Sequence, residues 1–132
     1  MDLAGARQTI FDLLSTDPDG TPDLSLEWVT KVYAGLQRSV DTSKAPLAIV
    51  VIANGMDSET ISCTVTIQAK PDVDVVSVQL WLDETVEAVE RLLDDSADSS
   101  LFTRGTWTID YAQSIDAFVA VCTGLTFARE DY

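Results

Sequence analysis

The spacing of hydrophobic residues changes midway through residues 59–95. Over residues 61–69 every second residue is apolar, and Ser, Thr and Gln side chains occupy the positions between them. This alternation predicts a strand with one buried face. After a short loop, the apolar residues recur every three or four positions. That spacing predicts an amphipathic helix over about 75–94, with Asp72 or Asp74 as its N-cap.

The same reading along the chain predicts one further helix and four further strands. The helix is expected at 3–14, and the strands at 26–36, 47–53, 106–112 and 117–127. The unbroken apolar run 47–53 is typical of a strand that is covered on both faces. Asn54 and Gly55 predict a hairpin turn into the alternating strand. The order α-β-β-β-α-β-β predicts a single α+β domain, a two-layer sandwich with two helices packed on a mainly antiparallel sheet.

Charge narrows the classes of partner. The 132-residue chain has 22 Asp and Glu against 8 Lys and Arg, a net charge of −14, and it contains no histidine. Binding to nucleic acid or to an anionic membrane surface requires clustered cations, so the charge of this chain disfavours both. Sixteen of the acids are Asp and only three cations are Lys. This balance is seen in proteins from salty cytoplasm, where salt screens self-repulsion, but it also fits an ordinary acidic domain.

The residue types also limit the chemistry. Without histidine, Ser-His-Asp and Cys-His catalytic arrangements and histidine metal sites are excluded. No Gly-rich phosphate loop occurs, and the adjacent acids, such as Asp83 and Glu84, lie on a helix face that we expect to be solvated. We therefore expect no enzyme activity and no cofactor. Cys63 and Cys122 each lie inside a predicted strand and are interpreted as buried thiols, with a disulfide left open.

The loop at 15–23 is the best candidate for a metal site. Read as a calcium loop that starts at Ser15, it places Asp17, Asp19 and Asp23 on three ligand positions. Its twelfth position is Leu26, where a calcium loop requires a bidentate Glu. The sequence therefore favours a plain acidic turn, and we expect no metal.

Four large apolar residues lie outside the main hydrophobic pattern. Leu80 and Trp81 flank the stripe of the second helix, Phe11 is off the stripe of the first, and Trp28 stands in a polar approach to the first strand. Each one alone is more commonly a core residue. Together, in a chain with positive mean hydropathy despite its charge, they are candidates for contacts between subunits.

The arrangement as a whole resembles that of the tail terminator (tail completion) proteins of long-tailed phages and archaeal tailed viruses. The resemblance rests on the order of elements and on VYAGL at 32–36 and APLAIVVIAN at 45–54. Within these, the motifs are Val32-Tyr33-x-Gly35 and Ala45-Pro46-Leu47-x-x-Val50-Val51. The resemblance covers nearly the whole chain. The chain departs from the family in the length of the segment at 15–28.

The resemblance implies a virion protein at the head–tail junction that is assembled in the host cytoplasm. Such proteins form a hexameric ring that caps the tail tube, stops its growth and joins it to the head. The implied partners are further copies of the chain, the tail tube protein and a head–tail connector or neck protein, with no catalytic residues and no membrane. DNA would pass through the ring without specific binding.

An acidic lining would let DNA slide through such a ring. The candidates for this lining are the Asp-rich loop or the acids of the second helix, namely Asp83, Glu84, Glu87 and Glu90. Three other readings stay open: another connector or neck protein, a small acidic protein-binding module that does not assemble, and an enzyme that uses acidic residues alone.

Overall fold

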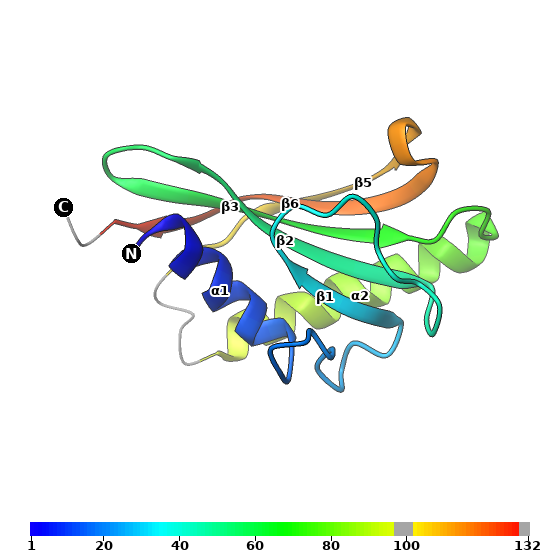
Figure 1. The fold of residues 1–132 in the computed structure, drawn as a ribbon. Coiled ribbons are helices and arrows are strands. Elements are labelled where there is room, and N and C mark those ends of the chain that lie inside the picture. The colour runs from blue at the N-terminus through cyan, green and yellow to red at the C-terminus, as the bar shows by residue number, and fades with distance from the viewer. Residues whose placement is uncertain (97–101, 130–132) are drawn as a thin grey trace.

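The computed structural model describes residues 1–96 and 102–129, which form two helices and a six-stranded sheet. Their bounds are α1 (Leu3–Leu14), β1 (Val29–Ala34), β2 (Leu47–Met56), β3 (Thr60–Ala69), α2 (Val75–Asp95), β4 (Phe102–Thr103), β5 (Thr106–Ala112) and β6 (Ala117–Ala128), with a 3-10 turn η2 (Gln113–Ile115) before β6 (Figure 1). The α+β class and the order of the predicted elements are confirmed. The two-residue β4 is additional, because it is too short to show any periodicity.

The sheet is mixed, with one parallel pair. Its order is β1-β2-β3-β6, and β4 and β5 both pair with β6 on its far side. β1 runs parallel to β2, and every other pair is antiparallel. A parallel pair needs a crossover connection, which here is the segment 35–46. The prediction of a mainly antiparallel sheet is confirmed, and the β1–β2 pair is its exception.

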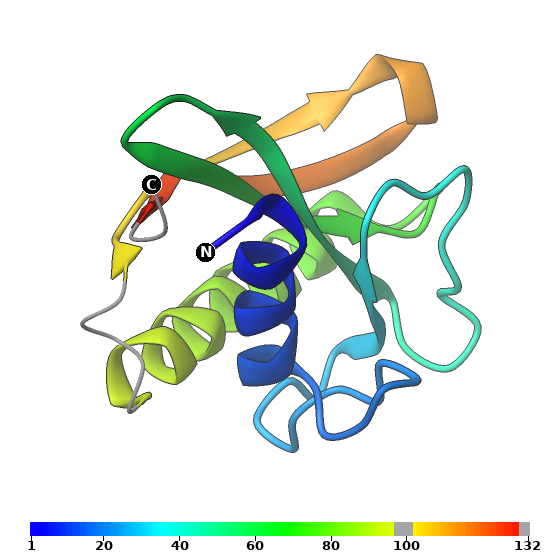
Figure 2. The same cartoon turned by 60° about the vertical axis from the view of Figure 1, so that its left-hand side comes forward.

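Both helices cover the same face of the sheet (Figure 2). α1 packs on β1, β2 and β3, and α2 packs on β3 and β6. The alternation in β3 points Ile61, Cys63, Val65, Ile67 and Ala69 toward the helices, and all five are fully buried. They meet the stripe of α2 that is formed by Val78, Leu82, Val89 and Leu93. Area removed from water on this face supplies the main stabilisation of the fold.

Acidic residues fix where both helices begin. The Asp2 carboxylate accepts the N–H of Gly5 at 2.7 Å, and the Asp74 carboxylate accepts the N–H of Ser77 at 3.0 Å. Each bond satisfies a donor that has no partner inside the helix. Asp74 is therefore the N-cap of α2. Asp72, the other candidate, lies in the preceding turn with φ of 60°.

The first two strands differ in part from their predictions. β1 is shorter than the expected 26–36, because Leu26 is buried in a turn before it and Leu36 lies beyond it, 87% exposed. In β2 the consecutive residues Leu47, Ala48 and Ile49 are fully buried, so both faces of the strand are covered at this point, as the apolar run predicts. Helices cover one face, and the crossover segment 35–46 lies over the other.

The two cysteines are buried free thiols on neighbouring strands. Cys122 pairs in register with Val65, two residues from Cys63, so both thiols face the helices. Burial raises the pKa of Cys63 from 9.0 to about 11 and raises that of Cys122 as well. The expectation of buried thiols is confirmed.

We expect both thiols to resist modification in the folded protein. At pH 8 the higher pKa leaves Cys63 roughly 100-fold less thiolate than an ordinary thiol. The neutral thiol is the form that the fold favours, so this contribution to stability is complete below pH 9.0 and is lost as the pH rises through about 11. Ellman's reagent should therefore react slowly with the native chain and rapidly in urea. Equal rates in the two conditions would contradict the burial.

Candidate functional site

Two tryptophans pack on each other where the chain enters β1. The rings of Trp28 and Trp81 have centroids 5.8 Å apart and are tilted by 38°. The indole Nε1 of Trp28 donates a hydrogen bond of 2.6 Å to Glu84 Oε2 on α2. Both rings are half-buried against the core. The pair therefore ties the segment before β1 to one flank of α2.

A second indole–carboxylate contact holds the opposite flank of α2. Trp107 Nε1, on β5, donates a hydrogen bond of 2.7 Å to Glu90 Oε1. Arg104, between β4 and β5, forms ion pairs with Glu90 and Asp94. The helix is thus anchored to the last part of the sheet by a charged network. A half-buried indole N–H needs an acceptor, so the presence of Trp107 in a strand indicates a contact of this kind. The sequence does not say which acid accepts the bond.

These contacts separate the candidate interface residues. Phe11 is 5% exposed within the core, so of the four candidates it has the least surface to offer another subunit. Its ring is buried because α1 packs on both the sheet and α2, which widens its apolar face. Trp28 and Trp81 have each other as partners. Leu80 is 53% exposed and remains available to another molecule.

The four candidate acids of α2 divide into two pairs. Glu84 and Glu90 each accept an indole N–H and so hold the fold together. Asp83 and Glu87 are exposed, and within residues 1–96 and 102–129 neither forms a salt bridge. The side-chain amide of Gln79 donates to Asp83 at 2.7 Å. Of the four acids, Glu84 and Glu90 bond to other segments of the chain, whereas Asp83 bonds within α2 to Gln79.

The Asp-rich loop is closed by its own hydrogen bonds. One oxygen of Asp17 accepts the N–H groups of Asp19 and Thr21, and the other accepts the Thr21 hydroxyl at 2.6 Å. The hydroxyl bond is the largest cause that lowers the pKa of Asp17. Among the described residues, no group of three or more His, Cys, Asp or Glu side chains could hold a metal ion. The loop has the bonding of an acidic turn.

Removing one indole N–H at a time should show which of the two indole–carboxylate contacts contributes more to stability. We expect Trp107→Phe to lower the free energy of unfolding by about 1.5–3 kcal/mol, because Glu90 is half-buried and charged. Trp28→Phe should cost only about 0.5–1 kcal/mol, since the exposed Glu84 regains water. Urea titrations of the two variants make the comparison. A larger loss for Trp28→Phe would contradict it.

Comparison with known proteins gives no relative by sequence: no family model matches the chain, and no curated protein matches it. No helix within the described part of the chain has the length and apolar character to cross a membrane.

Proposed function

We propose that the chain is a structural virion protein, the tail terminator of a long-tailed virus. In this role several copies close a ring on the tail tube, stop its growth and join the tail to the connector or neck of the head. The work is done by the shape of the assembled subunits, so the subunit acts as a building block and not as an enzyme.

The order of elements in one sheet carries the proposal. α1 is followed by the β1–β2–β3 part of the sheet, a long helix and the closing β5–β6 hairpin, which is the arrangement on which the resemblance to terminators rests. Both helices pack on one face of this sheet, which makes a single packed unit of the kind that a ring requires. The exposed Leu80 on α2 supports contacts with other proteins.

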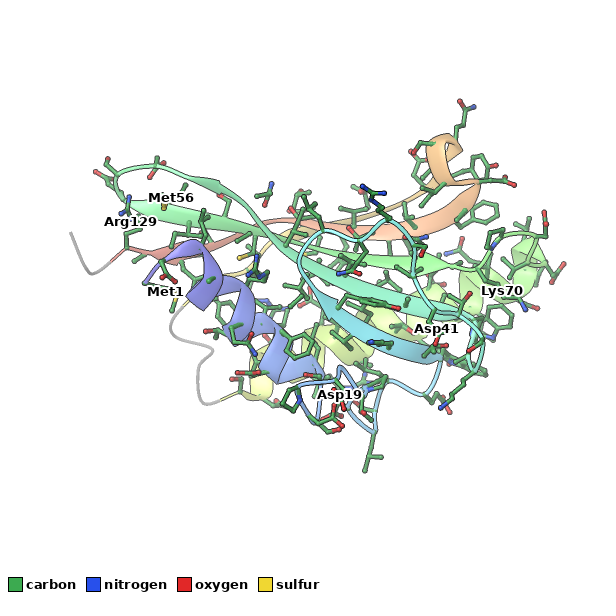
Figure 3. The ribbon with its side chains drawn as sticks, viewed as in Figure 1. Met1, Asp19, Asp41, Met56, Lys70 and Arg129 are labelled. Carbon is green, nitrogen blue, oxygen red and sulfur yellow. The ribbon has the colours of Figure 1, made fainter. Side chains whose placement is uncertain are left out.

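The passage for DNA is better lined by the Asp-rich loop than by α2. Asp83 and Glu87 share their side of the helix with the exposed Val76 and Leu80, and apolar side chains are unsuited to a water-filled passage. Asp17, Asp19 and Asp23 belong to one polar loop, in which Asp17 and Asp19 are exposed and Asp23 is half-exposed. Figure 3 shows Asp19 projecting at the edge of the molecule. Like charge on this loop would keep DNA from adhering.

Electron microscopy of the purified chain, alone and with the tail tube protein of its virus, tests the function. We expect rings with a central opening, and tubes whose length stops increasing once the chain is added. Rings that leave tube growth unchanged would point instead to another connector or neck protein. A chain that forms no rings with or without tubes would contradict the proposal and would leave a small protein-binding module.

A further inference from the structure

The side of α2 that faces away from the sheet carries an apolar and acidic stripe. Val76, Leu80, Asp83 and Glu87 are spaced by four, three and four residues, so they lie on one face of the helix, opposite its buried stripe. Val76 is 79% exposed and Leu80 is 53% exposed. The two acids continue the stripe toward the middle of the helix. We call these four residues the outer stripe.

The opposite face of the sheet carries a hollow with the complementary character. It has a volume of about 200 Å³ between the crossover segment and η2, and is lined on its apolar side by Leu36, Val50, Ile52 and Ile115. Leu36 is 87% exposed and Ile115 is 42% exposed. A cavity of about 150 Å³ holds a benzene ring, so this hollow has room for a large apolar side chain.

One cation lines the hollow, and a second lines the recess beside it. Arg38 lines the hollow and also lines, with Lys70, this adjoining recess of about 310 Å³. Lys70 is exposed at the end of the molecule where β3 leads into α2 (Figure 3). Neither side chain forms a salt bridge with another described residue. Within the described residues, Arg38 and Lys70 are therefore open to pairing with acids of another molecule.

We propose that the outer stripe of one copy docks in the hollow of the next copy. Leu80 would enter the hollow, and Asp83 and Glu87 would meet Arg38 and Lys70. Within one copy the stripe and the hollow lie on opposite sides of the sheet and do not meet. A second copy is the occupant with the matching charge: because each copy carries −14, its surfaces repel unless unlike charges are brought together.

The contact joins two different surfaces and is therefore head-to-tail. Such a contact produces a closed ring when its rotation closes, and otherwise a filament. The contact itself is inferred from the two surfaces. Only the closing of this contact into a ring rests on the proposed function. A helix that presents anchors four and three residues apart to an apolar groove is a recurrent mode of protein recognition.

Two complementary variants test this contact. Leu80→Asp changes the outer stripe and leaves the hollow intact. The double variant Arg38→Glu, Lys70→Glu changes the cations at the hollow and leaves the outer stripe intact. All three positions are exposed, so the variants should fold, which circular dichroism checks. We expect each variant alone to be monomeric, with association weakened at least about 100-fold. Mixed in equal amounts, they should form a one-to-one dimer of about 29 kDa and nothing larger, because only one good contact remains.

A compensating variant guards against an effect on folding. Asp83→Lys and Glu87→Lys, added to Arg38→Glu and Lys70→Glu in one chain, should restore assembly. Two results would overturn the inference and leave the proposed function in place. In the first, the double variant Arg38→Glu, Lys70→Glu forms rings as the wild type does. In the second, the wild type assembles but the mixture of the two variants stays monomeric. A wild-type chain that never assembles would overturn both.

Discussion

Phe127→Ala is expected to lower the free energy of unfolding by about 3–5 kcal/mol, the largest effect of any single truncation in the core. Phe127 is 1% exposed on β6, and its ring packs on Phe102 with centroids 5.4 Å apart. The loss combines the burial free energy of the deleted ring with that of a cavity that its neighbours fill only in part. The measurement is urea unfolding followed by tryptophan fluorescence.

Phe118→Ala, in the same strand, is the matched control. Phe118 is half-buried, and its ring meets Tyr111 edge-on at 5.3 Å, so water already reaches part of it. We expect a loss of about 1–2 kcal/mol, because less area is removed from water and no closed cavity is left. If both variants lost the same free energy, Phe127 would not lie at the centre of the core as described.

Gly20→Ala should destabilise the chain by about 2–4 kcal/mol. Gly20 has a φ of +87°, and a Cβ there would lie 2.0 Å from the carbonyl oxygen of Val32. The carbonyl of Gly20 in turn accepts the N–H of Val32 at 2.8 Å, which attaches the Asp-rich loop to β1. The methyl group therefore strains the backbone and pushes the loop off the strand. Urea unfolding measures the loss.

Gly35→Ala separates the two causes. Gly35 also has a positive φ, +102°, but the nearest atom to its Cβ is an Arg7 nitrogen at 3.9 Å. It should cost only the backbone strain, about 1 kcal/mol. A Gly20→Ala variant as stable as Gly35→Ala would show that the loop can leave β1 without loss.

The elements with local signals could be predicted from the sequence. β3 is recognisable from strict alternation, and α2 from its stripe and its acidic N-cap, because both patterns follow from the geometry of a single element. The parallel β1–β2 pair was not predicted. The only sequence sign of a parallel pair is a connection long enough for a crossover, and many other loops have that length.

The candidate site was only partly predictable, because its residues are separated by long stretches of chain. Leu80 was correctly placed outside the helix stripe, and the structure leaves it exposed. The sequence pattern predicts surface charge at Glu84 and Glu90, yet each carboxylate accepts an indole N–H from a distant segment. The hollow leaves no signal in the sequence. Arg38 and Lys70 come together only through the folding of the crossover segment over the sheet, which no sequence period records.

The mass of the chain in solution tests the central claim most directly. Light scattering after gel filtration, over a range of protein concentration and from low to molar KCl, would follow assembly of the 14.3 kDa chain. We expect a closed oligomer of about six copies, near 86 kDa, at salt concentrations that screen the net repulsion between acidic subunits. A monomer at every concentration and salt level, both alone and with tail tubes present, would contradict the claim that this fold is the building block of a ring.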